Sequence, residues 1–247
     1  MRQLQCAEIW GGIKNQDQDL CSGGLTISLY SSASDGGKGG DIYYFSVCPR
    51  DTLTRIAVAD VVGHGQAVSD VSQWMYTSLQ TRMNKLDGHE ILDELNRLAV
   101  DRGYNAVTTA TVVGYYTVKS TLYFCYAGHH PVLIRRRGES GWQPAKAGGS
   151  GGGYANLPLG VDIDVAYRQE QVAIGSGDRL FIYTDGVIEA PDQKRRLFGQ
   201  ERLLSILEDT SGGSPMEIKG AVLSALREHT GGTLGHDDVT LIVVEVR

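Results

Sequence analysis

The sequence has few cysteines and no long apolar run. Four cysteines occur among 247 residues. No two of them form a Cys-x-x-Cys pair and none is followed by arginine six residues later. A paired-cysteine zinc site, a disulfide framework and a cysteine-based phosphatase loop are therefore excluded. The longest apolar stretch, residues 110–118, contains Gly114 and is far shorter than the roughly 20 residues that a membrane-spanning helix needs.

The chain also lacks a strong charge of either sign. Acidic residues outnumber basic ones by 29 to 23, which gives a formal net charge of −6. Such a chain has no field that attracts a phosphate backbone or anionic lipids, so we expect neither nucleic-acid nor membrane binding. The first eight residues lack the positive-then-apolar pattern of a secretory signal, and we expect a cytoplasmic location.

Segments rich in β-branched and aromatic residues recur along the chain and predict strands. They are residues 25–30, 42–47, 53–62, 110–118, 121–126, 132–136, 167–172, 178–183 and 239–246. Short connections such as Lys119-Ser120 favour antiparallel hairpins, because a parallel crossover needs a dozen or more residues.

Apolar residues spaced about four apart predict two amphipathic helices between residues 69 and 103. The two stripes consist of Val71, Met75, Leu79 and Met83, and of Ile91, Leu95 and Leu98. A further helix is predicted to start after Ser214, which has Pro215 at the first helical position and Glu217 to complete a capping box.

Two groups of strands, each followed by helices, predict an α+β fold in which two antiparallel sheets pack as a sandwich flanked by helices. The chain has only six prolines, and its glycine-rich stretches at 36–40 and 148–153 are too short to separate domains. We therefore expect residues 1–247 to form a single domain. The segment 148–152 fits Gly-x-Ser-x-Gly, but without a flanking strand and helix we interpret it as a loop.

Aspartates with glycine within three residues occur at or near the ends of four predicted strands. These are Asp41 and the Asp237-Asp238 pair, each just before or at the start of a strand, and Asp60 and Asp185, each at the end of one. A single Asp-Gly pair is typical of an ordinary turn. If the four strand ends converge, however, several carboxylates share one cleft and oppose folding unless cations neutralise them. Oxygen-only ligands then indicate Mg²⁺ or Mn²⁺ rather than zinc.

The ordered series of motifs resembles the bacterial metal-dependent Ser/Thr protein phosphatases of the sporulation stage II E type, a branch of the PPM superfamily. The matching segments cover nearly the whole chain: Ile9-Trp10-Gly11-Gly12, Gly39-Gly40-Asp41, Ala59-Asp60-Val61-Val62-Gly63-His64-Gly65, Tyr126-Ala127-Gly128-His129-His130-Pro131, Leu157-Pro158-Leu159-Gly160, Tyr183-Thr184-Asp185-Gly186-Val187-Ile188-Glu189-Ala190, Phe198-Gly199 and Asp237-Asp238-Val239-Thr240. The resemblance implies a β-sandwich flanked by helices, with a centre for two Mn²⁺ or Mg²⁺ ions at one end.

The resemblance also implies a set of metal ligands. Asp60 would bridge both ions with the backbone carbonyl of Val61 as a further ligand, Asp185 and Asp237 would complete one ion, and Asp41 would hold the other directly or through water. Adjacent residues of an extended chain point in opposite directions, so only one residue of the Asp237-Asp238 pair can face the ions. The resemblance favours Asp237 and leaves Asp238 in a supporting or turn role.

The sequence has no clear counterpart of the arginine by which eukaryotic relatives grip phosphate. Arg50 and Arg55 are candidates by proximity in sequence, although we expect them to be solvated charges at a strand end. His64 is a candidate proton donor to the leaving seryl oxygen, with a backbone-bonded turn histidine as the alternative. For His129 and His130 we expect only backbone or packing roles.

The resemblance implies a Ser/Thr phosphoprotein phosphatase in which a metal-activated water attacks phosphorus without a covalent enzyme intermediate. Its substrate would be a phosphorylated regulatory protein, such as an anti-sigma-factor antagonist of a partner-switching circuit. The alternative is a phosphoprotein-binding module with structural metals and little turnover. A nucleotide cyclase would need a nucleotide pocket, for which the sequence has no motif. We expect any regulation to come from a separate partner or from residues outside this chain.

Overall fold

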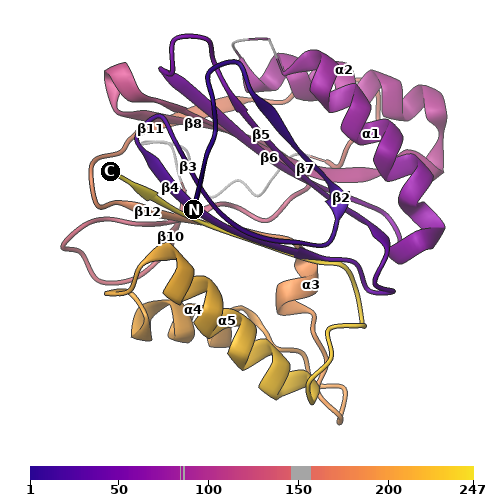
Figure 1. Cartoon of the computed structure of the whole chain (residues 1–247). Helices are drawn as coiled ribbons and strands as arrows, with labels where there is room; N and C mark the ends of the chain where they lie inside the picture. The colour runs from indigo at the N-terminus through magenta and orange to yellow at the C-terminus, as the bar shows by residue number, and fades with distance from the viewer. Residues whose placement is uncertain (84, 86, 146–156) are drawn as a thin grey trace.

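Two β-sheets pack face to face, with helices on both outer sides, in a computed structural model of the chain (Figure 1). The structure describes residues 1–83, 85, 87–145 and 157–247. The predicted α+β sandwich is confirmed. The glycine-rich segment at 148–153, with its Gly-x-Ser-x-Gly sequence, lies outside the described residues.

The first sheet has seven strands in the order β1-β3-β4-β13-β12-β9-β10. Only the pair of β1 and β3 is parallel among the described strands of this sheet. The strands are β1 (Arg2–Gln3), β3 (Gln16–Ser22), β4 (Leu25–Ser32), β9 (Leu133–Arg135), β10 (Gln143–Pro144), β12 (Arg179–Tyr183) and β13 (Val239–Val246).

The second sheet has six strands in the order β11-β8-β7-β6-β5-β2, with antiparallel pairing throughout its described part. The strands are β2 (Ile9–Lys14), β5 (Lys38–Val47), β6 (Leu53–Val61), β7 (Thr108–Tyr116), β8 (Thr121–Ala127) and β11 (Gln169–Ala173). The connection of β7 to β8 is short, as predicted, and contains the 3-10 turn η3 (Thr117–Lys119).

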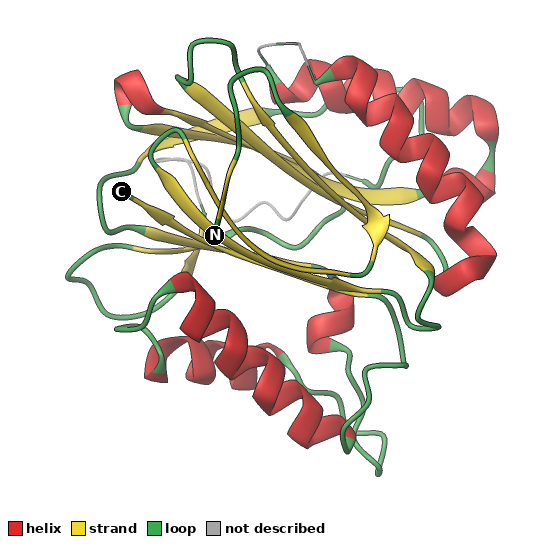
Figure 2. Cartoon of the chain, in the orientation of Figure 1, coloured by secondary structure: helices red, strands yellow, loops and turns green. Residues whose placement is uncertain are grey.

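Helices cover the outer face of each sheet (Figure 2). The helices α1 (Ser69–Arg82) and α2 (Gly88–Arg102) lie on the second sheet, and α3 (Asp185–Ile188), α4 (Gln200–Asp209) and α5 (Pro215–Thr230) lie on the first. Two further 3-10 turns are η1 (Gly65–Val68) and η2 (Tyr104–Ala106). None of the helices in the described ranges combines the length and low polarity that a membrane crossing requires.

Alternation along the strands separates the core into three layers. In β5, Phe45 packs between the sheets, whereas its neighbour Tyr44 packs under α1 and α2. In β13, Ile242 packs between the sheets, whereas Val243 packs under the helices of the first sheet. Both faces of the central strands are therefore buried.

The helix predictions are confirmed, including the start of α5, where Ser214 and Glu217 form the capping box. Most residues of the two predicted apolar stripes are buried. In α2 the buried face includes Leu92, which was not predicted, whereas Leu98 is only partly buried. The strands β2 and β3, at or near sheet edges, were not predicted, because glycine and polar residues replace the β-branched pattern there.

Candidate metal centre

Asp41 and Asp60 are direct partners on the neighbouring antiparallel strands β5 and β6. Opposite residues of such a pair point to the same face of a sheet. Asp41 has the same phase as Tyr43 and Phe45, which pack between the two sheets. Both carboxylates therefore point into the space between the sheets, at one end of the sandwich.

The first sheet provides hydrogen-bond donors for Asp41. Asp41 is buried, and its Oδ2 accepts a hydrogen bond of 2.8 Å from the hydroxyl of Thr184, which follows β12. The side chain of Thr240 in β13 is a second hydrogen-bond partner. Burial nevertheless raises the pKa of Asp41 well above its ordinary value, and the nearby charges of Asp238 and Asp185 raise it further.

Asp185 and Asp237 enter the same space from the ends of two neighbouring strands. Asp185 is the first residue of α3, close behind β12, and Asp237 lies just before β13, which pairs with β12. The pKa of Asp60 is raised well above its ordinary value, first by burial and then by the charges of the other four aspartates. Burial also raises the pKa of Asp237. All five predicted aspartates thus act on one another at one end of the molecule.

Asp238 differs from the other aspartates because backbone amides surround its carboxylate. Its Oδ1 accepts a hydrogen bond from the amide of Ser34 at 2.7 Å, and its Oδ2 accepts from those of Gly40 at 2.5 Å and Gly65 at 3.0 Å. It is only 2% exposed. One side chain therefore ties together the turn after β4, the start of β5 and the loop after β6. This arrangement favours Asp237 as the metal ligand, which stays a prediction.

Two glycines allow backbone segments to meet at the cluster. A Cβ on Gly40 would lie 2.9 Å from the carbonyl oxygen of Gly63 and 3.0 Å from that of Val61. A Cβ on Gly186 would lie 2.0 Å from the carbonyl oxygen of Asp238. Only glycine permits such approaches. The Val61 carbonyl, a predicted ligand, therefore borders the cluster.

His64 lies on the rim of the cluster. It is exposed in the loop between β6 and η1, and its Nδ1 lies 3.3 Å from the hydroxyl of Ser34. His64 is near enough to Asp237 to influence the pKa of that carboxyl, so it lies close to the acidic groups without being buried among them.

The neighbouring histidines of the β8–β9 connection have packing roles, as predicted. His129 is buried, and its Nδ1 lies 3.0 Å from the carbonyl oxygen of His130. Burial lowers the pKa of His129 to about 4. His130 stacks on Tyr183, with 5.3 Å between ring centroids.

The donor set fits hard divalent cations. The carboxylates of Asp41, Asp60, Asp185 and Asp237 and the Val61 carbonyl offer only oxygen donors, the kind that Mg²⁺ and Mn²⁺ prefer. Burial and the neighbouring negative charges raise the pKa values of Asp41 and Asp60, despite the hydrogen bonds that Asp41 accepts. Cations bound among these side chains would stabilise their charged forms.

A family model fits most of the chain. Residues 50–247 match the model of stage II sporulation protein E. The chain belongs to this family. The chain is similar to the phosphoserine phosphatase RsbU of Bacillus subtilis, with 27% identity over 232 residues. The alignment covers 93% of this chain and 64% of RsbU, so the chain spans less than two thirds of that relative.

Solved structures share the fold of this stage II sporulation protein E family member. The SiaA-PP2C domain of Pseudomonas aeruginosa aligns with a TM-score of 0.77 and 20% identity, over 90% of this chain and 86% of that chain. The PP2C phosphatase domain of SpoIIE from Bacillus subtilis, solved with a fragment of its regulatory domain, aligns with a TM-score of 0.72 and 19% identity, over 90% of this chain and 63% of that chain.

Neither Arg50 nor Arg55 lies at the acidic cluster in this family member. Both are near the end of β6 opposite to Asp60. Arg50 is exposed, as expected, but the expectation of a solvated charge is wrong for Arg55, which is 8% exposed. Its position in β6 faces the helices, and its guanidinium donates a hydrogen bond to the carbonyl of Lys85 between α1 and α2.

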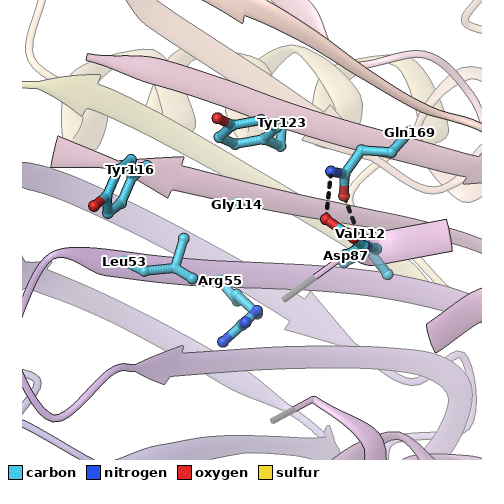
Figure 3. A pocket seen from close by; sticks show the side chains of 9 residues that line it. Leu53, Arg55, Asp87, Val112, Gly114, Tyr116, Tyr123 and Gln169 are labelled. Carbon is cyan, nitrogen blue, oxygen red and sulfur yellow. Dashed lines mark hydrogen bonds between the residues drawn. The ribbon is translucent and has the colours of Figure 1, made fainter. Parts of the chain in front are cut away.

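Arg55 lines a cavity of about 320 Å³ on the outer face of the second sheet (Figure 3). Leu53, Tyr116 and Tyr123 line it from three neighbouring strands, and Gln169 lines it from β11. The cavity is remote from the acidic cluster because these residues lie toward the other ends of the strands. It therefore has no part in the candidate metal centre.

Proposed function

We propose that this chain is a metal-dependent Ser/Thr phosphoprotein phosphatase. The observation that carries the proposal is the convergence of five aspartates, from the ends of β5, β6, β12 and β13, at one end of the sandwich. Together with bound divalent cations, such a cluster is suited to the hydrolysis of phosphate esters. The likeness to a protein named phosphoserine phosphatase supports the same reaction here.

Two Mn²⁺ or Mg²⁺ ions are the proposed cofactors. The proposed ligands are Asp60 for both ions, the Val61 carbonyl beside it, Asp185 and Asp237 for one ion, and Asp41 for the other. The bound ions would supply an activated water and neutralise charge on the phosphoryl oxygens. The protein itself contributes the fixed positions of these side chains, since Asp41 is held by Thr184 and the loops around it by Asp238.

His64 is the proposed proton donor to the leaving seryl oxygen. Its Nδ1 lies near the Ser34 hydroxyl, which leaves Nε2 for donation. His64→Ala should therefore lose the alkaline limb of the pH–rate profile. His89→Ala, at the start of α2, is the matched control and should keep it. A His64→Ala profile with an unchanged alkaline limb would reduce His64 to a turn residue.

The proposed substrate is a phosphoserine or phosphothreonine in a regulatory protein, such as an anti-sigma-factor antagonist. The likeness to RsbU supports this class, and we propose that the reaction takes place in the cytoplasm. Regulation by a separate partner is part of the same proposal.

Hydrolysis of a phosphoserine peptide tests the proposal, with Mn²⁺ either added or chelated. Wild type should release phosphate only with Mn²⁺, and Asp60→Asn and Asp185→Asn should each lose at least about a hundredfold in rate, because each lacks a ligand charge. Asp101→Asn, at an exposed position in α2, should behave as wild type. The proposal would be refuted if phosphate release were the same with and without Mn²⁺ and the same in wild type and both Asp→Asn variants. Peptide binding without turnover would indicate the phosphoprotein-binding module instead.

A further inference from the structure

Apolar side chains are exposed beside the acidic cluster. Ten large apolar side chains are exposed within the described ranges, and five of these surround the end of β6 and the start of β7. The five, here called the apolar rim, are Val62, Tyr104, Leu157, Val161 and Ile163. Tyr104 is the extreme case, with 90% of its surface exposed.

Backbone hydrogen bonds hold the segments of the apolar rim side by side. The amide of Val62 donates to the carbonyl of Val107 at 2.9 Å. Thr108 and Leu159 exchange two hydrogen bonds, of 3.1 and 2.9 Å. Tyr104 begins the 3-10 turn that leads into Val107. The backbone segments that carry the apolar rim therefore lie side by side.

The outer segment of the apolar rim is fixed by a buried side chain of α2. Asn96 is 1% exposed; its Oδ1 accepts a hydrogen bond from the amide of Gly160, and its Nδ2 donates to the carbonyl of Asp162, both at 2.8 Å. Val161 lies between these two anchors and Ile163 follows them. Their side chains are thus presented to solvent by an ordered backbone.

The apolar rim adjoins the candidate metal centre. Val62 is two residues beyond Asp60, and the cross-strand partner of Asp60 is Thr109, close to the Val107 carbonyl that anchors Val62. Exposed apolar groups that gather on one surface mark interaction sites. An extended chain advances about 3.3 Å per residue, so residues a few positions from a phosphoserine at the cluster come within reach of Val62, which is two residues from Asp60.

We propose that the apolar rim binds apolar side chains that flank the phosphoserine in an extended segment of the substrate protein. This inference rests on the proposed phosphatase function. Contacts of the metal centre with phosphate are the same for every phosphoserine, so discrimination between substrates depends on surfaces beside the centre. The apolar rim is such a surface, and it selects substrates by burying their apolar side chains.

Two phosphoserine peptides of equal length and charge test the inference. One carries leucine and the other glutamine at the positions on both sides of the phosphoserine. Wild type should prefer the leucine peptide by about tenfold in kcat/KM, mainly through KM. The double variant Tyr104→Ser/Ile163→Ser should reduce this preference to about twofold or less. The control Val118→Ser removes an exposed valine at the opposite end of β7 and should leave the preference unchanged.

The ratio of kcat/KM for the leucine peptide to that for the glutamine peptide reports on the apolar rim alone, because a change at the metal centre alters both values equally. Equal rates on the two peptides in wild type, or an unchanged preference in the double variant, would overturn the inference. A loss of preference in Val118→Ser would overturn it as well. Hydrolysis of p-nitrophenyl phosphate by wild type with Mn²⁺ keeps the two proposals separate. If that small ester is not hydrolysed, it is the phosphatase function that fails.

Discussion

The Asp238 carboxylate accepts a hydrogen bond from the Gly40 amide, 198 residues earlier in the chain, at 2.5 Å. We expect Asp238→Asn to weaken this contact, because an amide group offers one acceptor where the carboxylate offers two. The variant should lose about 1 to 3 kcal/mol of unfolding free energy. It should also require more Mn²⁺ for half-maximal activity, because the loops beside the proposed ligands are no longer fixed. Urea denaturation and an Mn²⁺ titration measure the two effects.

Asp209→Asn, at the end of α4, is the control for Asp238→Asn. It lies outside the amide cluster and should change neither quantity. An Asp238→Asn protein with normal stability and normal Mn²⁺ dependence would contradict the role assigned to Asp238.

The raised pKa values of Asp41 and Asp60 predict how the metal-free protein responds to pH. Because burial and neighbouring charges raise these pKa values in the folded state, the folded protein binds protons more readily than the unfolded chain. The stability that this provides is present at low pH and is lost as the pH rises from the ordinary value of 3.8 through the raised values. Asp41→Asn carries no such charge, and in chelator it should be more stable than wild type by about 1 to 2 kcal/mol near pH 8.

The advantage of Asp41→Asn should shrink near pH 5, where wild-type Asp41 is more fully protonated. Urea denaturation of both proteins at the two pH values, in chelator, measures this difference. Saturating Mn²⁺ should reverse the order at the higher pH, because ions that bind only the folded state stabilise it and wild type has the complete ligand set. A variant that is less stable than wild type in chelator at both pH values would contradict the argument.

Gly40→Ala should disrupt the candidate metal centre from the backbone side. The new methyl group would lie within 3.0 Å of two carbonyl oxygens, those of Gly63 and Val61. The loop after β6 must therefore shift, and we expect a fall in activity of at least about tenfold with a destabilisation of about 1 to 3 kcal/mol. Gly220→Ala is the matched control, because a Cβ there meets nothing within 4 Å. Equal behaviour of the two variants would show that the close approach at Gly40 is not required.

Lys219 is a buried cation that joins α5 to the first sheet. Its Nζ lies 2.5 Å from Asp17 Oδ1 and 3.4 Å from Asp19 Oδ1, and its side chain is 6% exposed. Lys219→Met keeps an apolar stem but removes the ion pairs with Asp17, whose side chain is 63% exposed, and with Asp19, which keeps a hydrogen bond from Ser28. It should therefore cost about 1 kcal/mol of unfolding free energy. Activity should not change, since α5 is remote from the acidic cluster. Lys194→Met, at an exposed site, should change stability by less than about 0.5 kcal/mol in the same urea titration.

The capping box of α5 and the placement of aspartates at strand ends could be predicted from the sequence, because both depend on residues that are neighbours in sequence. Ser214 and Glu217 satisfy each other within one turn, so tertiary contacts do not alter the outcome. The convergence of these aspartates was only a condition of the prediction; Asp41 and Asp60 meet because β5 and β6 are consecutive antiparallel strands, so the start of one lies beside the end of the other.

The role of Asp238 and the burial of Arg55 could not be predicted, because both depend on contacts between distant segments. Nothing near Asp238 in sequence reveals that amides of Ser34, Gly40 and Gly65 will surround it. Arg55 is likewise covered by the carbonyl of Lys85, which only the packing of α1 and α2 brings to that place.

The position of β13 has a consequence for the nascent protein. This strand follows every other described strand in sequence, yet it pairs with β4 on one side and β12 on the other, in the interior of the first sheet. Until it leaves the ribosome, the earlier aspartates have neither Asp237 nor the amide anchor of Asp238. A chain synthesised only as far as α5 therefore cannot assemble the cluster, and the capacity to capture ions arises only after residues 237–246 have left the ribosome.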